Sequence, residues 1–390
     1  MAATSVLVAG DDHYGALAGL RALRAAGFEP WLATPRRNTY AARSRAAVGV
    51  IDVPRPAAGD DGFVRAMADA ADRIGVAAIL PASEETLVAL AERRDRLPEQ
   101  VAVGAPAREV VAVVTDKRAV ADRAAAAGLD LLPLREIGPA DLNGGVEFPA
   151  VVKPLRTKTF TYSGFEHGRV RRVDDAEELR HAVSGLPGER WLVQPYLPGR
   201  LAAVCGVAWE GELVCAVHQI ALRIAPADCG GSAYAVTIPR DSELEEGAAR
   251  LLRSIGWSGL FQLQFIRSGR DAYVIDFNPR MYGSMSLAVA AGLNLPAIWT
   301  ELLLGRAPSV GGYRVGVRFR AEEKDVRALA RELVRGRAVP ALRGLVPHQK
   351  TAHAVFSLRD PLPVLTSVGK LKARLAERRA TQRQRSVDSS

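Results

Sequence analysis

The sequence is poor in the residues on which disulfide frameworks, zinc sites and aromatic binding surfaces depend. Its 390 residues include three cysteines, six histidines and 6% aromatic residues. Cys205, Cys215 and Cys229 are odd in number and form no Cys-x-x-Cys pair, which argues against a disulfide framework and a structural zinc site. No apolar run reaches the roughly 18 residues that cross a bilayer, and no basic segment with a following apolar stretch opens the chain. We therefore expect a cytoplasmic protein.

The remaining composition is that of a globular protein with unevenly distributed charge. The chain is 48% hydrophobic and 24% charged, and its length suggests two or three domains. Residues 370–385 contain seven basic residues and one acidic residue, so they contribute +6 of the formal net charge of +9. A solvated helix end explains this basic tail, and contact with an anionic surface is the alternative. No nucleic-acid partner is expected.

An open α/β domain is predicted for residues 1–110. Apolar runs at 6–9, 30–33 and 77–80 have the length of strands, and a helical pattern occupies 17–27. Ligands of such domains bind at the carboxyl ends of the strands. A dehydrogenase would use the same kind of unit, but Gly10 and Gly15 lack the third glycine of a dinucleotide-binding fingerprint.

The middle of the chain alternates strands, loops and helices. We expect a helix from Thr115–Lys117 to Gly128, a buried strand over 148–154, a mobile polar loop over 156–168, a helix from Asp174 and a proline-broken strand over 191–199. Hairpins are predicted at 204–220 and 260–277, and helices at 242–255, 284–291 and 295–304. The last part has a predicted strand at 313–319, a helix at 325–335 and a strand at 352–356.

The two strands of the second hairpin carry the most informative polar residues. By the period of two, Asp276 and Asn278 share one face, and Gln264 on the partner strand can point to the same place. Carboxylate and amide oxygens are the ligands that Mg²⁺ accepts in proteins. Arg280 follows on the same stretch and suits bidentate contact with an anion. A polar hairpin that ends in an ordinary Asn-Pro turn is the alternative interpretation.

Two lysines and a loop strengthen the first interpretation. Lys153 ends a buried strand, where a lysine is costly unless it meets an anion. Ser163 and Gly164 lie in the following hydroxyl- and glycine-rich loop, which is typical of loops that cover phosphates. Lys117 opens an earlier helix. A snorkelling lysine and a plain surface loop would account for each feature separately, so the order of the features along the chain carries the argument.

That order resembles the ATP-grasp superfamily, most closely its carboxylate–amine ligase and carbamoyl-phosphate-synthase-like branch. The resemblance covers roughly residues 1–305. It implies an α/β pre-ATP-grasp domain over 1–110 and the α+β lobes of an ATP-grasp domain over 111–305, with a hinge near 194–199. A small α+β C-terminal extension with the basic tail is expected over 306–390.

The resemblance also implies a nucleotide site. Lys117 and Lys153 match lysines that contact ATP phosphates in this superfamily. The hinge looks like the segment that holds adenine, and it consists of Gln194, Pro195, Tyr196 and Leu197. Ser163 and Gly164 would belong to the same site.

A metal and reaction site is implied beside it. Asp276 and Asn278 match the residues that bind Mg²⁺, and Gln264 stands where the family commonly has an acid. Arg280 matches the arginine that contacts the transferring phosphoryl group, and Arg223 resembles a second arginine that lines the reaction site. The cofactors implied are ATP and Mg²⁺, with Mn²⁺ as an alternative.

The expected activity is ATP-dependent joining of a carboxylate to an amine through an acyl phosphate, with release of ADP and phosphate. A catalytically weak or inactive ATP-binding protein with a sensing or scaffold role is the alternative. The expected partners are small-molecule carboxylates and amines, and a homodimer is the assembly considered.

Overall fold

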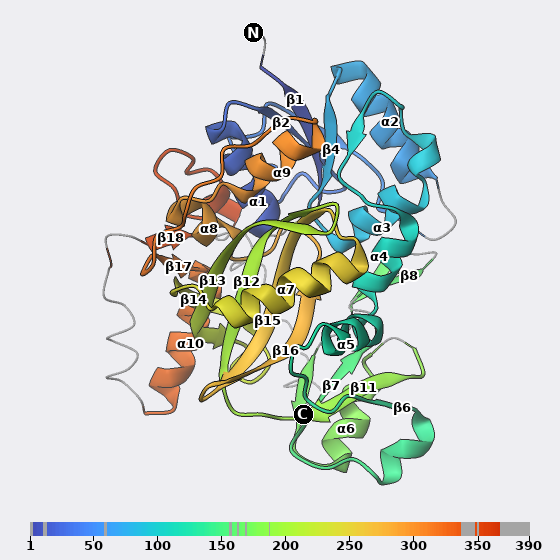
Figure 1. Cartoon of the computed structure of the whole chain (residues 1–390), viewed down its shortest axis with the longest axis vertical. Helices are drawn as coiled ribbons and strands as arrows, with labels where there is room; N and C mark the ends of the chain where they lie inside the picture. The colour runs from blue at the N-terminus through green and yellow to red at the C-terminus, as the bar shows by residue number, and fades with distance from the viewer. Residues whose placement is uncertain are drawn as a thin grey trace, which may run out of the picture.

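The computed structural model describes residues 3–10, 14–57, 61–155, 158–161, 164–167, 170–186, 188–336, 348 and 351–366. Its N-terminal part is a five-stranded parallel sheet in the order β3-β2-β1-β4-β5 (Figure 1). The strands are β1 (Ser5–Ala9), β2 (Glu29–Thr34), β3 (Val50–Asp52), β4 (Ala78–Pro81) and β5 (Ala102–Val103). The helices are α1 (Tyr14–Ala25), α2 (Gly62–Ile74), α3 (Glu84–Glu92), the 3-10 turn η1 (Arg94–Arg96) and α4 (Arg108–Thr115).

Helices cover both faces of this sheet, which explains the nearly continuous apolar sequence of its strands. Val8 packs with Leu20 and Leu23 of α1 in one buried cluster. Leu7, which points to the other face, packs with Met67 of α2 in a second cluster. The open α/β arrangement expected at the N-terminus is therefore present.

A smaller antiparallel sheet follows, in the order β10-β7-β11-β6. It consists of β6 (Arg135–Ile137), β7 (Ala150–Pro154), β10 (Arg171–Val173) and β11 (Trp191–Pro195), with α6 (Ala176–Val183) and the 3-10 turn η2 (Pro139–Asn143) beside it. Helix α5 (Lys117–Ala126) precedes it, and the side chain of Asp116 caps that helix by accepting bonds from two backbone amides. The carboxylate of Asp175, not Asp174, caps α6.

The expectation of a mobile loop over 156–168 is wrong for the described residues. They form a two-stranded hairpin of β8 (Lys158–Thr161) and β9 (Gly164–His167), with Phe160 opposite Phe165. Threonine and phenylalanine favour extended backbone, which accounts for the strands. Ser163 lies outside the described residues, and Gly164 is the first residue of β9.

The largest sheet has seven strands in the order β16-β15-β12-β13-β14-β17-β18. Its strands are β12 (Arg200–Trp209), β13 (Glu212–Ala225), β14 (Gly231–Thr237), β15 (Gly259–Ser268), β16 (Asp271–Asn278), β17 (Arg318–Arg320) and β18 (Thr351–His353). Neighbouring strands are antiparallel except β17 and β18. The associated helices are α7 (Ser242–Ile255), α8 (Met285–Ala291), α9 (Leu295–Leu303) and α10 (Glu322–Val334).

Local sequence explains the confirmed elements of this sheet. Glu210 and Gly211 both have positive φ, 52° and 83°, as the two-residue turn between β12 and β13 requires. The Asp241 side chain caps α7, and left-handed Gly256 ends it. In Figure 1, α7 lies across one face of the sheet.

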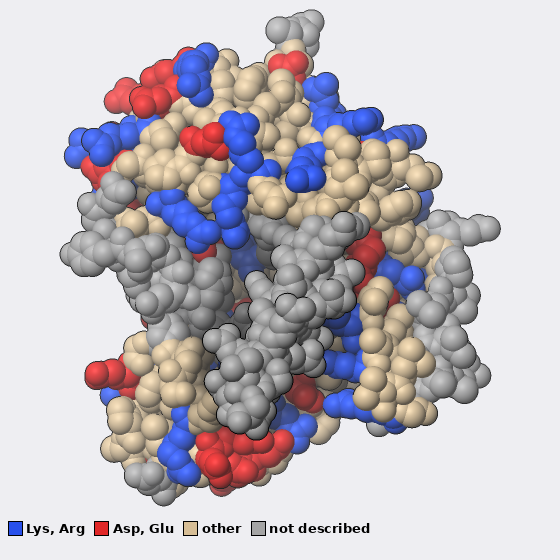
Figure 2. All heavy atoms as spheres, turned by 180° about the vertical axis from the view of Figure 1, so that it is seen from behind, with Lys and Arg blue, Asp and Glu red and all other residues tan. Residues whose placement is uncertain are grey.

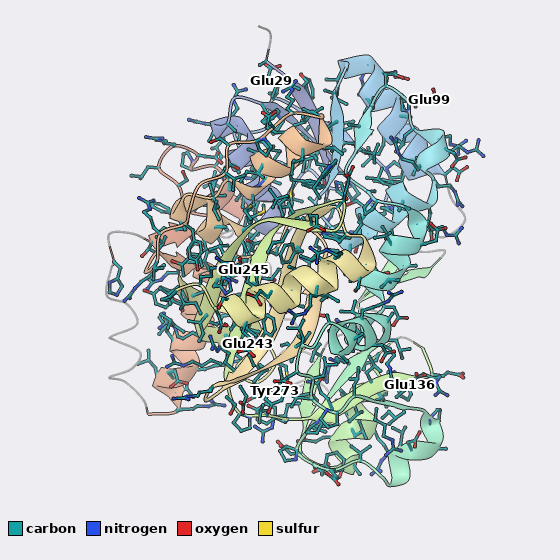
Figure 3. All side chains as sticks on the ribbon, viewed as in Figure 1. Glu29, Glu99, Glu136, Glu243, Glu245 and Tyr273 are labelled. Atoms are coloured by element: carbon teal, nitrogen blue, oxygen red, sulfur yellow. The ribbon has the colours of Figure 1, made fainter. Side chains whose placement is uncertain are left out.

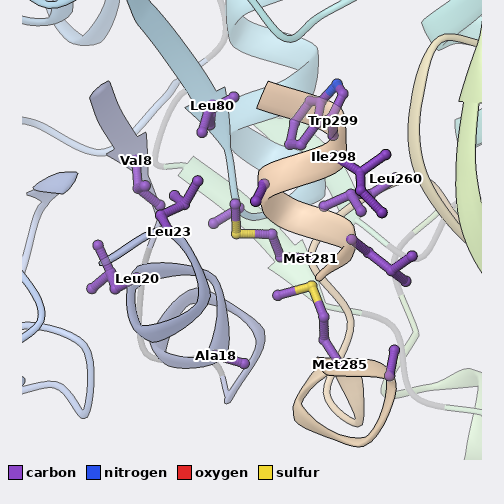
Figure 4. Packing of buried hydrophobic residues seen from close by; sticks show 14 of the residues in the cluster. Val8, Ala18, Leu20, Leu23, Leu80, Leu260, Met281, Met285, Ile298 and Trp299 are labelled. Carbon is purple, nitrogen blue, oxygen red and sulfur yellow. The ribbon is translucent and has the colours of Figure 1, made fainter. Parts of the chain in front are cut away.

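Helices α8 and α9 join the large sheet to the N-terminal part. Met281 and Met285 lie in the same buried cluster as α1 and Trp299 of α9 (Figure 4). A Cβ atom at Gly19 of α1 would lie only 2.5 Å from the sulfur of Met281. Glycine at this position therefore permits the close approach.

The C-terminal elements differ in their bounds from the prediction. The strand expected over 313–319 is limited to Arg318–Arg320, because Gly316 has a φ of +81° that interrupts extended backbone. Helix α10 begins at Glu322 and not at Asp325, with three acidic residues in its first turn that suit a helix N-terminus. Strands β17 and β18 extend the large sheet, and the basic tail lies outside the described residues.

No single helix in the described ranges is long and apolar enough to cross a membrane; α8 and α9 meet the criteria only as a pair, with a 92° bend between them.

Candidate active site

Strands β15 and β16 position the polar residues from which the metal site was predicted. Their antiparallel register sets Gln264 opposite Asp276 and Gln262 opposite Asn278. The ladder is irregular between Gln264 and Phe265. The pairing thus brings Gln264, Asp276 and Asn278 to one region of the sheet, as the period of two predicts.

Lys117 occupies the space beside Asp276. It is the first residue of α5, and its ammonium group forms an ion pair with the Asp276 carboxylate. The two side chains are 10% and 26% exposed, so the pair is largely shielded from water. Helix α5 is fixed by its Asp116 cap, which aims Lys117 across to β16.

Lys153, at the end of β7, is the most deeply buried cation of the site. Its side chain donates to Oε1 of Gln194 at 2.8 Å and to the backbone oxygen of Ile275 at 3.2 Å. Burial, and secondly the neighbouring charge of Lys117, lower the pKa of Lys153 to about 8. Both partners are neutral acceptors, so the protonated lysine gains strongly from an anion that enters the site.

Asn278 and Arg280 belong to a buried hydrogen-bond network. Arg280 donates to Oδ1 of Asn278 at 2.9 Å, and the Asn278 amide donates to Gln262 at 3.3 Å. The hydroxyl of Ser284 links Gln262 at 3.4 Å to Gln219 at 2.8 Å. The network fixes the direction of Arg280. The residue-based prediction missed Gln219 and Ser284, which are 65 residues apart and show no local pattern.

A cavity of about 300 Å³ collects most of the predicted nucleotide and metal residues. Those that line it are Lys117, Lys153, Gln194, Pro195, Tyr196, Leu197, Gln264 and Asp276. Asn278, Arg280, Gly164 and Arg223 are not part of its lining. Its wall also includes Asp228 and Cys229, which no sequence pattern singled out, and the flanking Gly230-Gly231 pair was the signal nearest to them.

The predicted hinge leaves the small sheet at Pro195. Its proline has no N–H to continue a ladder, and the next amide, of Tyr196, donates to the backbone oxygen of Pro149 at 2.9 Å. The guanidinium of Arg172 lies 4.3 Å from the centroid of the Tyr196 ring. The ring is therefore held by a cation–π contact at the rim of the cavity.

The oxygen donors around Asp276 are few, and they suit one mode of Mg²⁺ binding. The described residues hold no group of three or more His, Cys, Asp or Glu side chains that could bind a metal. Asp276 and Gln264 face the cavity, but Oδ1 of Asn278 already accepts a bond from Arg280. Mg²⁺ is often bound by one or two carboxylates together with substrate phosphates, and this donor set fits that mode of binding.

Arg223 and His218 lie apart from the cavity. Arg223 forms a bidentate ion pair with Asp325 of α10, at 2.6 and 3.0 Å, and faces a second, adjoining cavity. His218 is 2% exposed and bonds Glu245 at 2.9 Å, so it is a hydrogen-bonded residue of the sheet. Figure 3 shows Glu245 on α7, which covers this sheet.

Sequence comparisons find similarity over part of the chain. Residues 188–325 match a family model described as "ATP-grasp in the biosynthetic pathway with Ter operon". The carbamoyl phosphate synthase large chain of Rubrobacter xylanophilus is 25% identical over 166 residues, or 40% of this chain. The match spans 15% of that protein's length.

Several solved structures share the fold. The L-amino acid ligase of Bacillus licheniformis is 14% identical with a TM-score of 0.59, and the match covers 78% of this chain and 75% of the ligase chain. The biotin carboxylase of Campylobacter jejuni is 17% identical with a TM-score of 0.59, covering 81% and 74%. The N5-carboxyaminoimidazole ribonucleotide synthetase of Thermus thermophilus is 18% identical with a TM-score of 0.57, covering 80% and 81%. These similarities confirm the predicted fold class.

Proposed function

We propose that this chain, which resembles the ATP-grasp superfamily in sequence and fold, is a ligase that uses ATP and Mg²⁺ to join a carboxylate to an amine. The main support is the cavity in which Lys117, Lys153 and Asp276 meet the hinge segment. A flat base at the hinge and phosphates at the lysines would fill a cavity of this lining. Mn²⁺ is an alternative metal.

The proposed reaction has two balanced steps. A carboxylate oxygen of the substrate attacks the γ-phosphorus of ATP, the bond to the β-phosphate oxygen breaks, and ADP and an acyl phosphate form. An amine nitrogen then attacks the acyl carbon, phosphate leaves, and the nitrogen loses a proton to water. Phosphoryl transfer requires positioning and neutralisation of charge more than a protein nucleophile.

The side chains of the cavity supply these requirements. Lys153 and Lys117 would neutralise phosphate oxygens, and entry of the nucleotide would draw Lys117 away from Asp276. Asp276 and Gln264 would hold Mg²⁺, which neutralises charge on the phosphates when bound. Arg280, held by Asn278, would meet the transferred phosphoryl group.

ADP release from pooled carboxylates and amines tests this proposal. Asp276→Asn and Arg280→Ala should each reduce the rate by roughly a hundredfold or more, since each removes a charge that acts on the reacting groups. Asp271→Asn, at the exposed start of the same strand β16, is the matched control and should leave the rate unchanged. Full turnover by both active-site variants would refute the site.

A non-catalytic ATP-binding protein is the second candidate. It is favoured by the amide of Gln264, which offers the metal no charge, so that Asp276 is the one carboxylate of the predicted ligand set. Calorimetry separates the two, because tight ATP binding without ADP release would support the second candidate. The small-molecule partners, a homodimer and a cytoplasmic location remain proposals.

A further inference from the structure

A second cavity, of about 690 Å³, lies beside the proposed nucleotide cavity. It is formed by the end of β13 and one side of α10, and Gly199, Leu201, Ile224 and Ala227 line both cavities. Its charged lining is mostly positive, with Arg200, Arg223, Lys324, Arg327, Arg331 and Arg335 against Glu332. Figure 2 shows lysine and arginine atoms in the hollow between the upper and lower parts of the molecule. A cavity of this kind suits an anion.

The acidic residues nearby are engaged elsewhere. Asp325, 1% exposed, is shared by Arg223 at 2.6 Å and Arg320 at 3.1 Å. Both guanidinium groups also lie over the ring of Tyr234, at 4.5 and 5.1 Å from its centroid. The Asp325 carboxylate and the Tyr234 ring thus hold both guanidinium groups in a fixed arrangement at this end of the sheet.

Lys324 stands where the two cavities meet. Its ammonium nitrogen lies 3.4 Å from the Cβ position of Gly231, which lines the nucleotide cavity, and 5.9 Å from the centroid of the Tyr14 ring. Burial, and secondly the charge of Arg280, lower the pKa of Lys324, and Glu323 offsets only part of this effect. No carboxylate in the described ranges lies within ion-pair distance of its ammonium group.

The carboxylate of Glu323 interacts with two residues other than Lys324. Its carboxylate accepts a bond from the hydroxyl of Tyr40 at 3.1 Å and forms an ion pair with Arg327. Lys324 and Arg280, drawn from α10 and the end of β16, thus place like charges near each other beside the proposed reaction site. Like charges that are partly buried favour a bound anion between them.

We propose that this second cavity binds a negatively charged group of a substrate, a carboxylate or phosphate distinct from the reacting carboxylate, with Lys324 as its main anchor. The inference rests on the proposed function, because it makes the cavity a substrate subsite of that ligase. It predicts a preference for substrates with an additional negative charge.

Calorimetric titration of the full chain tests the subsite with defined probes: succinate, citrate and inorganic phosphate, with neutral dimethyl succinate for comparison. At least one anion should bind the wild-type chain, and Lys324→Gln should weaken it about tenfold or more, or about 1.4 kcal/mol. Lys324→Arg, which keeps the charge, should bind within about threefold of wild type. Arg24→Gln removes an exposed charge near the end of α1 and should have no effect.

Titrations with and without ADP and Mg²⁺ keep the two proposals separate. Anion binding that depends on Lys324 in a chain that binds no ADP would support the subsite and count against the ligase. The subsite is refuted if no anion binds, if dimethyl succinate binds as tightly as succinate, or if Lys324→Gln binds like wild type. Circular dichroism and urea unfolding of each variant show that the fold is retained.

Discussion

Replacing Lys153 with methionine should stabilise the free protein while it abolishes ATP binding. The lysine is 5% exposed, and its pKa falls from 10.5 to about 8 in the folded chain. Since a tenfold change in proton affinity corresponds to about 1.4 kcal/mol, holding the protonated lysine costs the fold about 3 kcal/mol near pH 7. Loss of the hydrogen bonds to Gln194 and Ile275 destabilises the variant by about 1 kcal/mol each, which offsets part of this gain. We expect a net gain of about 1 kcal/mol for Lys153→Met.

The pH dependence of this gain follows from the same values. The unfolded chain keeps the lysine proton up to about pH 10.4, whereas the folded chain loses it near pH 8. Raising the pH through this window therefore stabilises the folded wild type, by about 1.3 kcal/mol between pH 7 and 9. The variant has no such group, so its advantage over wild type should shrink as the pH rises.

Urea unfolding of both proteins at pH 7, 8 and 9 measures the effect. Taking the difference between the proteins cancels the opposite contribution of Cys205 and Cys215, because burial raises their pKa values, to about 12 and about 11, without any influence of Lys153. The control variant Arg24→Met also replaces a cation with methionine, but at an exposed position. It should change neither the free energy of unfolding nor its pH dependence. A loss of stability in Lys153→Met, or a difference that does not vary with pH, would refute the reasoning. Retained ATP binding would refute the role of Lys153.

Two further predictions concern the metal and the C-terminal segment. Gln264→Glu should lower the Mg²⁺ concentration for half-maximal ADP release by several-fold, because it adds a charge opposite Asp276; an unchanged value would place the metal elsewhere. Asp360→Ala should cost roughly 3 kcal/mol in urea unfolding, because this 6% exposed carboxylate accepts bonds from Ser44 at 2.6 Å, Arg45 at 2.9 Å and Arg21 at 2.8 Å. Burial alone would raise the pKa of Asp360, but these bonds lower it overall. The carboxylate therefore contributes to the free energy of unfolding above about pH 4, and this contribution should vanish as the pH falls further.

Local patterns predicted which residues of the candidate site lie near one another. The period of two predicted the face shared by Asp276 and Asn278, and the structure sets Gln264 opposite the former. A lysine within a buried strand marked Lys153 before any contact was known, because lysines are rarely buried unless they are paired. The order of these motifs along the chain carried the resemblance to the ATP-grasp superfamily, and that resemblance implied the fold class.

The contribution of α10 could not be read from the sequence. Lys324 stands between Glu323 and Asp325, so the segment has the pattern of a locally neutral, solvated helix. In the structure the helix points the three residues in different directions. Glu323 turns to Tyr40 and Asp325 to arginines on the sheet, which leaves Lys324 facing the cavities. Each of these partners is distant in sequence, so the residues of α10 carry no local pattern that predicts the contacts.

The contact between Asp360 and Arg21 has a consequence for the order of folding. The two residues are 339 positions apart, and Ser44 and Arg45 also bind the same carboxylate. The N-terminal part can assemble its sheet early during synthesis, but these polar groups gain their carboxylate partner only when a segment 339 positions further along the chain has been made. The N-terminal sheet domain thus obtains part of its hydrogen bonding from residues far away in sequence, and these contacts form only when both segments are present.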